Sequence, residues 1–309
     1  MKPTMRRYQR ADDYWRIREF LRNVFLMNNR VQASWELARF DYWRWHGILN
    51  MGDGTLEDDV FIWENDKGEI VAVLNREAPG SVFLQTHPDF GTDVLQTEML
   101  AVAEQHLTVT AGDNRRSLHV WAETEDSRLK KLLSTRDYAI CELKKPEHQR
   151  RRFLTKPVSR PSVAEGYTIR SLGDVDEHQA RCRVSWQAFH PDEPDENFED
   201  GWYQNIQRAP LYRRDLDLVA VASSGEHAAF CTIWFDDVTR TGLFEPVGTA
   251  PQHQRRGLGK AILAEGLTRL RHLGADIAFV GSYSEPAHTL YASVGFETYR
   301  VLEPWCKES

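Results

Sequence analysis

The sequence repeats one order of expected elements in its two halves, and this repeat constrains the fold more than any other feature. Each half reads as an alternating strand, a helix, two strands joined by a Gly-containing turn, a strand running into a proline, a long helix, a short apolar strand and a short helix. Pro88 matches Pro251 at an offset of 163 residues, and Tyr138 matches Phe296 at 158. A shared order at nearly one offset predicts a duplicated fold.

Strands mixed with helices predict the α/β class, with a mixed sheet in each of two tandem domains. Residues 144–165 carry many charges and three prolines with little apolar periodicity, which is typical of a domain end followed by a linker. We therefore expect one domain over residues 1–157 and a second over residues 158–309. Around Gly257–Gly281, the strand–helix–strand order predicts parallel pairing.

The composition argues against several classes of protein. With 41% hydrophobic residues, the 309-residue chain is too apolar for disorder, and its net charge of −7 argues against nucleic acid or an anionic membrane as the partner. No apolar run reaches the ~18 residues of a membrane span. Four scattered cysteines without a C-x-x-C pair predict neither disulfides nor a zinc site, so we expect a cytoplasmic protein without a metal. The oligomeric state stays open.

The segment Gln254–Lys260 (QRRGLGK) follows an expected strand and opens an expected helix. Free N–H groups and the positive end of the helix dipole lie at such a start, and Gly257 and Gly259 let the backbone approach an anion. With three basic side chains, the segment predicts a pyrophosphate site; a Gly-rich helix start with a basic surface is the alternative. A P-loop needs Ser or Thr at Ala261 and a dinucleotide fingerprint needs a small residue at Ile262, so both fail.

Three segments of the second half resemble the GNAT superfamily of acetyl-CoA-dependent N-acetyltransferases. QRRGLG matches the family pattern Q/R-x-x-G-x-G/A, and Glu245–Pro251 (EPVGTAP) resembles the fourth strand running into a proline turn. Ala287–Phe296 (AHTLYASVGF) resembles the closing motif A-x-x-L-Y-x-x-x-G-F. The resemblance spans residues 167–300 and implies tandem GNAT-like domains with acetyl-CoA as co-substrate.

The resemblance also implies which residues hold coenzyme A. Backbone groups of the strand would bind the acetyl carbonyl and the pantetheine arm, and the glycine loop would bind the pyrophosphate. Relatives often carry asparagines ahead of and within the closing helix, where Ser284 and His288 stand in this chain, so we expect His288 to contact the coenzyme. The expected binding residues are Val247, Gly248, Thr249, Gln254, Arg255, Arg256, Gly257, Leu258, Gly259, Lys260 and His288.

Two side chains are expected to move protons. Coenzyme A leaves as a thiolate, and a tyrosine hydroxyl near the sulfur can supply its proton, which favours Tyr291 as the acid. The attacking amine must lose a proton, directly or through water, and Glu245 is the candidate base. Glu245 lies two residues before Val247, so strand alternation places both on one face. The alternatives are a core-packing tyrosine and an edge-strand glutamate that faces water.

The first half lacks these features. Asp89–Asp93 (DFGTD) stands where the second half has its glycine loop, with acids in place of arginines and a single glycine. Leu133 occupies the position of Tyr291, and Asp137 the position of Gly295. Because carboxylates would repel phosphate, we expect a degenerate first domain without a coenzyme site, acting as a scaffold or a substrate wall.

These features predict transfer of acetyl from acetyl-CoA to a primary amine, with a small molecule as the acceptor. Residues 190–200 hold six acids and no Lys or Arg, which would attract a cationic amine; a solvated acidic loop is the alternative. Two other hypotheses are an acyl-CoA-binding regulatory or interaction module without turnover, and a protein or peptide N-acetyltransferase. The presence of both Glu245 and Tyr291 favours an enzyme over a pure binding module.

Overall fold

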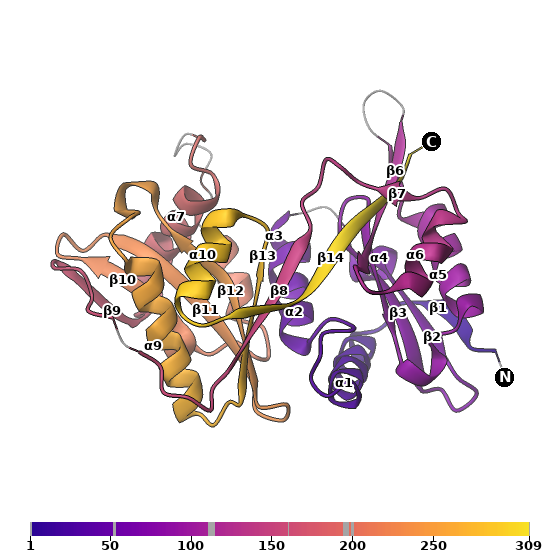
Figure 1. Ribbon diagram of the computed structural model, residues 1–309, viewed down its shortest axis with the longest axis horizontal. Helices are drawn as coiled ribbons and strands as arrows, with labels where there is room; N and C mark the ends of the chain where they lie inside the picture. Colours follow the sequence, from indigo (N-terminus) through magenta and orange to yellow (C-terminus); the bar gives the residue numbers. More distant parts are fainter. Residues whose placement is uncertain are drawn as a thin grey trace. The chain divides into compact units, whose positions relative to one another are not determined.

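The computed structural model describes residues 2–51, 54–110, 115–159, 161–193, 198 and 201–308 (Figure 1). The chain forms two compact units, and neither is one continuous stretch of sequence. The first unit comprises Met1–Trp43, Met51–Glu147 and Arg300–Ser309. The second unit comprises Arg44–Asn50 and His148–Tyr299.

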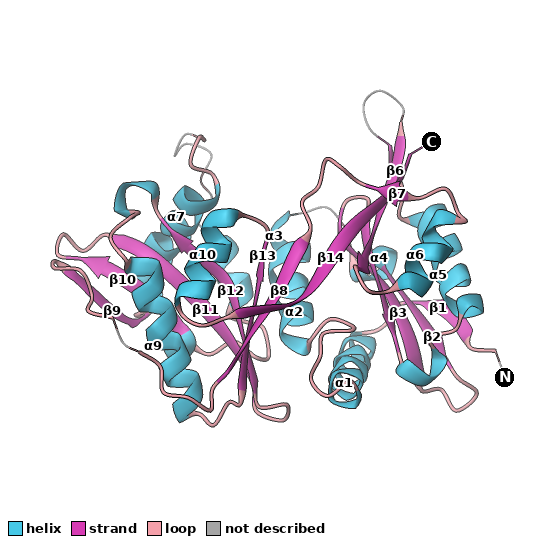
Figure 2. Ribbon diagram, viewed as in Figure 1, coloured by secondary structure: helices cyan, strands magenta, loops and turns pink. Residues whose placement is uncertain are grey.

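In the first unit, helices flank a sheet with the strand order β1-β2-β3-β4-β6-β14 (Figure 2). Neighbouring strands are antiparallel except for β4 and β6, which are parallel. The strands are β1 (Thr4–Arg7), β2 (Val60–Glu64), β3 (Ile70–Ala78), β4 (Ser81–Thr86), β6 (Arg116–Glu123) and the end of β14 (Glu297–Glu308), with β5 (Val109–Thr110) and β7 (Ala139–Ile140) paired to β6 and β14. The helices are α1 (Ala11–Met27), α2 (Leu37–Tyr42), α4 (Leu56–Asp59), α5 (Asp93–His106) and α6 (Ser127–Ser134).

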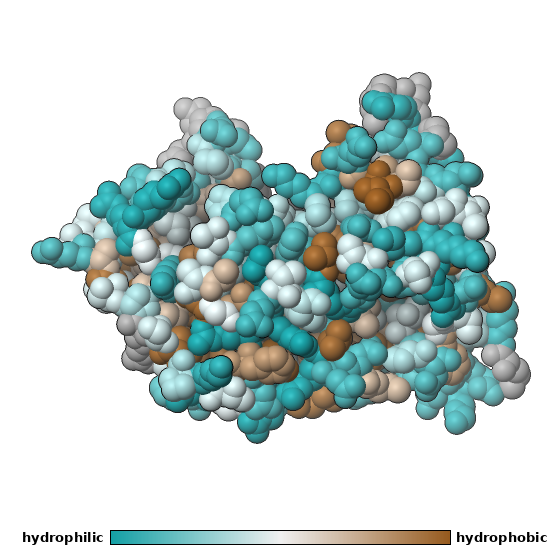
Figure 3. Space-filling view, in the orientation of Figure 1, coloured by the Kyte–Doolittle hydropathy of each residue, from teal (hydrophilic) through white to brown (hydrophobic). Residues whose placement is uncertain are grey.

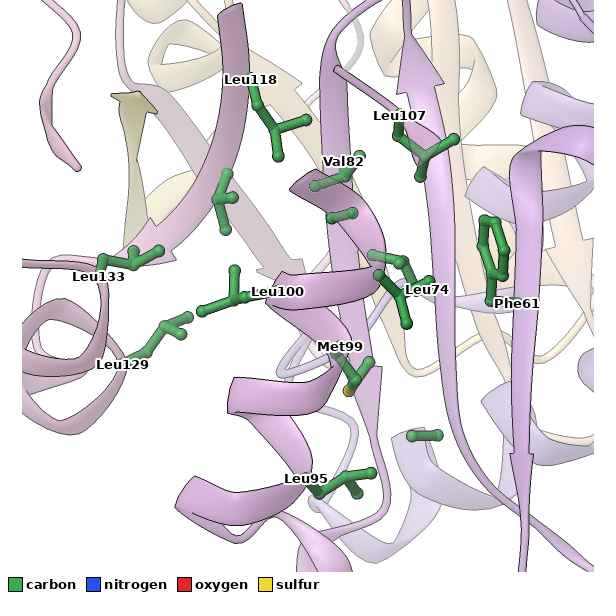
Figure 4. Close-up of a cluster of buried hydrophobic side chains, with 14 of the residues drawn as sticks. Phe61, Leu74, Val82, Leu95, Met99, Leu100, Leu107, Leu118, Leu129 and Leu133 are labelled. Carbon is green, nitrogen blue, oxygen red and sulfur yellow. The ribbon is translucent and has the colours of Figure 1, made fainter. Parts of the chain in front are cut away.

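The core of the first unit lies between α5, α6 and one face of this sheet. Side chains from both helices and from β2, β3, β4 and β6 form one buried cluster (Figure 4). Met99 and Leu100 of α5 and Leu133 of α6 are fully buried in it. Burying large aliphatic side chains contributes about 1.5–3 kcal/mol each, so this cluster alone gives the unit a substantial core.

The second unit repeats the same sheet, with the order β9-β10-β11-β12-β13-β8. Again one neighbouring pair, β12 and β13, is parallel and the others are antiparallel. The strands are β8 (Glu147–Phe153), β9 (Tyr167–Ser171), β10 (Asp217–Ala222), β11 (His227–Asp236), β12 (Thr241–Thr249) and β13 (Ile277–Ser282). The helices are α7 (His178–Phe189), α8 (Trp202–Ile206), α9 (Leu258–His272) and α10 (Glu285–Ser293), together with most of the π-helix Trp43–Ile48 and of α3 (Leu49–Met51).

The repeat extends to individual contacts, which confirms the predicted α/β class and the duplication of the fold in two tandem units. Arg6 of β1 binds Asp13, and Arg170 of β9 binds Glu177, each through two charged hydrogen bonds to the acid seven residues later. After the last helix of each repeat, the chain closes in the same way. The Tyr138 N–H donates to the Leu133 carbonyl, and the Phe296 N–H donates to the Tyr291 carbonyl, both at 3.1 Å.

The strands that close the two sheets are exchanged along the chain. The stretch 144–165, expected to end in a linker, contains β8, which pairs with β13 of the second unit. The last strand, β14, follows the second repeat but pairs through Leu302–Glu308 with β6 of the first unit. Each unit therefore takes its closing strand from the other repeat.

The surface visible in Figure 3 is largely hydrophilic, with hydrophobic residues in small separate groups. In the part of the chain that the structure describes, no helix is both long and apolar enough to cross a membrane.

Candidate active site

In the second unit, the parallel strands β12 and β13 separate after a short paired region. They pair at Thr241–Leu243 with Ile277–Phe279, but β12 continues to Thr249 and β13 to Ser282. Beyond Leu243, the side of β12 facing β13 has no strand partner among the described residues. Its backbone donors and acceptors on that edge are therefore available to an extended ligand, as in β-strand addition.

The expected backbone-binding residues Val247, Gly248 and Thr249 lie on this separated part of β12, and all three are half-buried. Their other edge pairs with β11 through Cys231, Phe230 and Ala229 respectively. Gly248 is packed tightly: an added Cβ would lie 2.6 Å from the Phe230 ring. A side chain there would displace the ring, so the position requires glycine for steric reasons.

Helix α9 begins directly after β12 and a short 3-10 turn, with Gly257 as its N-cap. Gly257 has φ +75°, and no side chain caps the helix start. The first helical backbone bond runs from the Ala261 N–H to the Gly257 carbonyl at 3.0 Å. The preceding N–H groups have no intrahelical acceptor, so the positive end of the helix is open to an anion.

The other residues of the predicted pyrophosphate loop surround this helix start. Gln254 donates through Nε2 to the Thr249 carbonyl at 3.3 Å and so ties the loop to the end of β12. Gly259 packs against α10, since an added Cβ would lie 3.2 Å from Leu290 Cδ2. The side chains of Arg255, Arg256 and Lys260 are exposed, whereas that of Leu258 is buried in the core.

Tyr291 lies on α10, buried in the core cluster of the second unit with 7% of its surface exposed. No hydrogen bond of its hydroxyl to another described residue is found. Burial, followed by the nearby Cys231 and Glu245, raises the pKa of Tyr291 well above the ordinary tyrosine value, while Arg150 acts in the opposite direction. The hydroxyl therefore stays protonated over the physiological range and has a proton to donate.

Glu245 sits at an irregularity of β12 rather than in a regular strand. The register with β11 shifts between Cys231 and Ile233, so Glu245 and Pro246 lie in a β-bulge. Because of the bulge, Gly242 contacts Leu270 of α9 while Gly248 contacts Ala188 of α7, although regular alternation would give both glycines one face. Alternation along the strand therefore does not show, as expected, that the Glu245 and Val247 side chains lie on one face of β12. Glu245 does act, after burial and Cys231, to raise the pKa of Tyr291.

His288 lies on α10 one turn before Tyr291. Its Nδ1 is 3.5 Å from a Glu285 carboxylate oxygen, and its Nε2 is 3.5 Å from the Ser282 carbonyl. Its ring centroid is 4.3 Å from that of His148, which lies on β8. These contacts place His288 on the β8 side of α10.

Strand β8 brings a residue that sequence reasoning did not select, Arg150. Its Nε donates to Ser282 Oγ at 3.1 Å, and it is 8% exposed. The available signal was the alternation of His148, Arg150 and Arg152 within a strand-length segment. The charges and prolines around it had favoured a linker instead.

Two further expectations concern the acceptor and metals. Of the acidic segment 190–200, residues 194–197, 199 and 200 lie outside the described residues. Within the described ranges, no group of three or more His, Cys, Asp or Glu side chains is arranged to hold a metal ion.

Comparison with known proteins identifies this region. The sequence pattern of the Acetyltransferase (GNAT) family matches residues 179–296. A mycothiol acetyltransferase of Thermobifida fusca is 32% identical over 158 residues, which cover 47% of this chain and 48% of that protein, so the chain matches about half of that relative. A mycothiol acetyltransferase of Thermobispora bispora is 25% identical over 264 residues, covering 78% of this chain and 81% of that protein.

The same likeness holds for the fold of the whole chain. A tandem GNAT protein from the clavulanic acid biosynthesis pathway superposes with a TM-score of 0.68, at 12% identity, over 99% of this chain and 98% of that one. At that identity, the likeness concerns the fold. Residues 179–296 therefore form a domain of the GNAT acetyltransferase family, within a chain that has the tandem GNAT fold.

Proposed function

We propose that the second unit transfers the acetyl group of acetyl-CoA to the primary amine of a small molecule, by direct attack of the amine on the thioester. The open start of α9 follows a strand whose edge toward β13 has no strand partner beyond Leu243 among the described residues, and this is the observation that carries the proposal. A pyrophosphate needs the free N–H groups of a helix start, and the pantetheine arm beside it needs a strand edge with free backbone groups. The name of the relatives, mycothiol acetyltransferase, supports a small-molecule acceptor.

In this proposal, the loop Gln254–Lys260 binds the pyrophosphate. The N–H groups at the start of α9 donate to phosphate oxygens, and Arg255, Arg256 and Lys260 add positive charge at the exposed rim. Val247, Gly248 and Thr249 bind the pantetheine arm and the acetyl carbonyl through their backbone. His288 contacts the coenzyme from α10.

The chemical step needs one proton acceptor and one donor. The amine nitrogen attacks the acetyl carbon, and Glu245 takes a proton from that nitrogen directly or through water. The C–S bond then breaks, the sulfur keeps the electron pair, and Tyr291 donates its proton to the thiolate. The raised pKa of Tyr291 keeps the proton in place until the thiolate develops. No covalent enzyme intermediate is needed.

The test is an acetyl-CoA consumption screen over amines, amino acids, polyamines, aminoglycosides and peptides, run with the full chain. Turnover with a small amine that is lost in Glu245→Gln and Tyr291→Phe would support the proposal. Coenzyme binding without turnover on any acceptor would favour the acyl-CoA-binding module. Turnover confined to peptides would favour the protein or peptide N-acetyltransferase.

A further inference from the structure

Strand β8 presents a row of basic side chains to α10. His148, Arg150 and Arg152 alternate along the strand and so share one face. The His148 ring stacks against that of His288 at 4.3 Å, and Arg152 donates through Nη1 to the Val294 carbonyl just after the helix. These two contacts show that this face of β8 looks toward α10, with Arg150 between them.

Tyr291 holds the matching position on α10. It lies three residues after His288 and three before Val294, so the three positions follow one side of the helix. Arg150 lies on this face of β8, and its pairing partner Val280 of β13 belongs to the same core cluster as Tyr291. The two groups also influence each other, because the guanidinium acts to lower the pKa of Tyr291 against the effect of burial.

Arg150 is a buried cation without an anionic partner in a salt bridge. Its exposure is 8%, its hydrogen bond goes to the neutral Ser282 hydroxyl, and no salt bridge of Arg150 is found among the described residues. Burial lowers the pKa of Arg150, opposed by Glu285 and Tyr291. A buried charge without a salt bridge is costly, so its presence near a tyrosine points to an anion that forms during the reaction.

We propose that Arg150 is a positioning residue for the acid step, stabilising the phenolate that Tyr291 becomes when it protonates the departing thiolate. The inference rests on the proposed role of Tyr291. As the C–S bond breaks, the sulfur takes the Tyr291 proton and the phenolate oxygen keeps the negative charge beside the guanidinium. Water then returns a proton to Tyr291, and the proton that Glu245 received is released to solvent, so charge and protons balance.

Burial disfavours a phenolate at position 291, and Arg150 acts against that effect. Burial is the largest cause that raises the pKa of Tyr291, ahead of Cys231 and Glu245. When the thiolate departs, Cys231 is a neutral thiol, because burial raises its pKa well above the ordinary value, and Glu245 has taken the amine proton. Arg150 of β8 acts to lower the pKa of Tyr291, so without it the phenolate would form in a buried site that disfavours an anion.

The first test is a double-mutant cycle on acetyl transfer with Arg150→Leu and Tyr291→Phe. Arg150→Leu should lower kcat about tenfold, with the KM for acetyl-CoA changed less than about threefold, because the effect acts on proton transfer. In the Tyr291→Phe background, Arg150→Leu should change kcat less than about twofold. Arg150→Lys, which keeps the charge, should recover part of the rate.

Arg151→Leu is the matched control. Arg151 is the next residue on β8 but points to the opposite face, where its guanidinium lies 4.6 Å from the Tyr299 ring centroid. Its removal should leave kcat near the wild-type value. Equal losses of kcat from Arg150→Leu with and without the Tyr291 hydroxyl, or an equal loss from Arg151→Leu, would overturn the proposal.

A second test needs no acceptor, so it separates this inference from the proposed function. The chain is labelled with 3-fluorotyrosine, and the fluorine signal absent from Tyr291→Phe is assigned to position 291. In Arg150→Leu, this signal should titrate at a pH about one unit higher than in the otherwise unchanged chain. An unchanged midpoint would overturn the role of Arg150 even in an active enzyme, whereas a shifted midpoint in a chain without turnover would contradict only the proposed function.

Discussion

The helix that follows the separated strand begins differently in the two units. In the first unit, α5 starts after Thr92, whose Oγ1 accepts the Leu95 N–H at 3.3 Å, and Asp93 adds a carboxylate to the first turn. In the second unit, α9 starts after Gly257 without a side-chain cap and beside basic residues. The first helix satisfies its own N-terminus, whereas the second leaves it open for an anion.

Most of the surrounding architecture is shared. In the first unit, β4 pairs in parallel with β6 only at Ser81 and Val82 and then continues to Thr86, as β12 does beyond β13. The closing helix also ends alike, with Asp137 at φ +66° where the second unit has Gly295 at φ +82°. The two units therefore share their fold and differ in a few residues at the helix start that is proposed to bind the coenzyme.

The largest expected difference between the units is in coenzyme binding. Gly257→Glu should abolish binding, because its carboxylate would occupy the pyrophosphate space; losing two or more charge-assisted hydrogen bonds costs about 3 kcal/mol or more. Gly91→Glu in the first unit should leave the affinity nearly unchanged. Gly91 has φ −64°, and an added Cβ would meet its nearest neighbour at 3.7 Å. Calorimetric titration with coenzyme A measures both.

Gly257→Ala tests the effect of backbone strain alone on coenzyme binding, because it adds a Cβ without a charge. An added Cβ at Gly257 meets nothing within 4 Å, so the positive φ alone would cost about 1–2 kcal/mol. One site per chain, weakened by Gly257→Ala and lost with Gly257→Glu, fits the comparison. Two sites per chain, or a loss through Gly91→Glu, would show that the first unit binds coenzyme A.

The second difference concerns turnover. Tyr291→Phe should lower kcat by roughly 10²–10⁴, the usual contribution of a positioned acid. The unfolding temperature should hardly change, since no hydrogen bond of the Tyr291 hydroxyl is found among the described residues. Tyr138→Phe removes a buried hydroxyl from the first unit and is the control, expected to leave kcat unchanged. Comparable losses of kcat in both variants would remove the catalytic distinction between the units.

A third contrast is one of stability and is smaller. Arg6→Met should destabilise the first unit by about 1.5–3 kcal/mol, because the Asp13 side chain is only 5% exposed. Arg170→Met should cost the second unit less than about 1 kcal/mol, since Arg170 and Glu177 are 39% and 25% exposed and solvent screens the pair. Hydrogen exchange of β1 and β9 peptides measures each unit separately. A larger loss of protection in β9 would reverse the expected order.

The smallest expected effect is the pH dependence of these pairs. Arg170 holds the pKa of Glu177 below its ordinary value. Burial acts to raise the pKa of Asp13, but Arg6 and the Gln9 and Arg10 backbone N–H groups together lower it. A lowered carboxyl pKa adds stability that is present above the unfolded value of about 4 and is lost as the pH falls through the folded value. Protection of β1 and β9 should therefore fall as the pH drops below about 4. Arg6→Met and Arg170→Met should each weaken the pH dependence of hydrogen-exchange protection in their own unit. An unchanged pH dependence in either variant would contradict this prediction.

Local signals in the sequence were enough to predict the duplicated α/β fold. Strand and helix periodicities depend on neighbouring residues, so the order of elements could be read in each half. The helix start at Gly257 was also readable, because glycine, basic residues and a following helix are all local features. The same reasoning identified the acids at Asp89 and Asp93 in the first half.

Strand pairing and the environment of Tyr291 required the tertiary structure. The alternation in residues 147–153 is compatible with any neighbouring strand, so the sequence could not assign β8 to β13 or β14 to β6. The bulge at Glu245 and Pro246 changed which side chains share a face of β12. Arg150 influences the pKa of Tyr291 across 141 residues of chain only because these non-local contacts form. The sequence by itself determined the elements and the glycine-rich helix start proposed to bind phosphate, since both depend on near neighbours, whereas folding decided which distant groups are buried together.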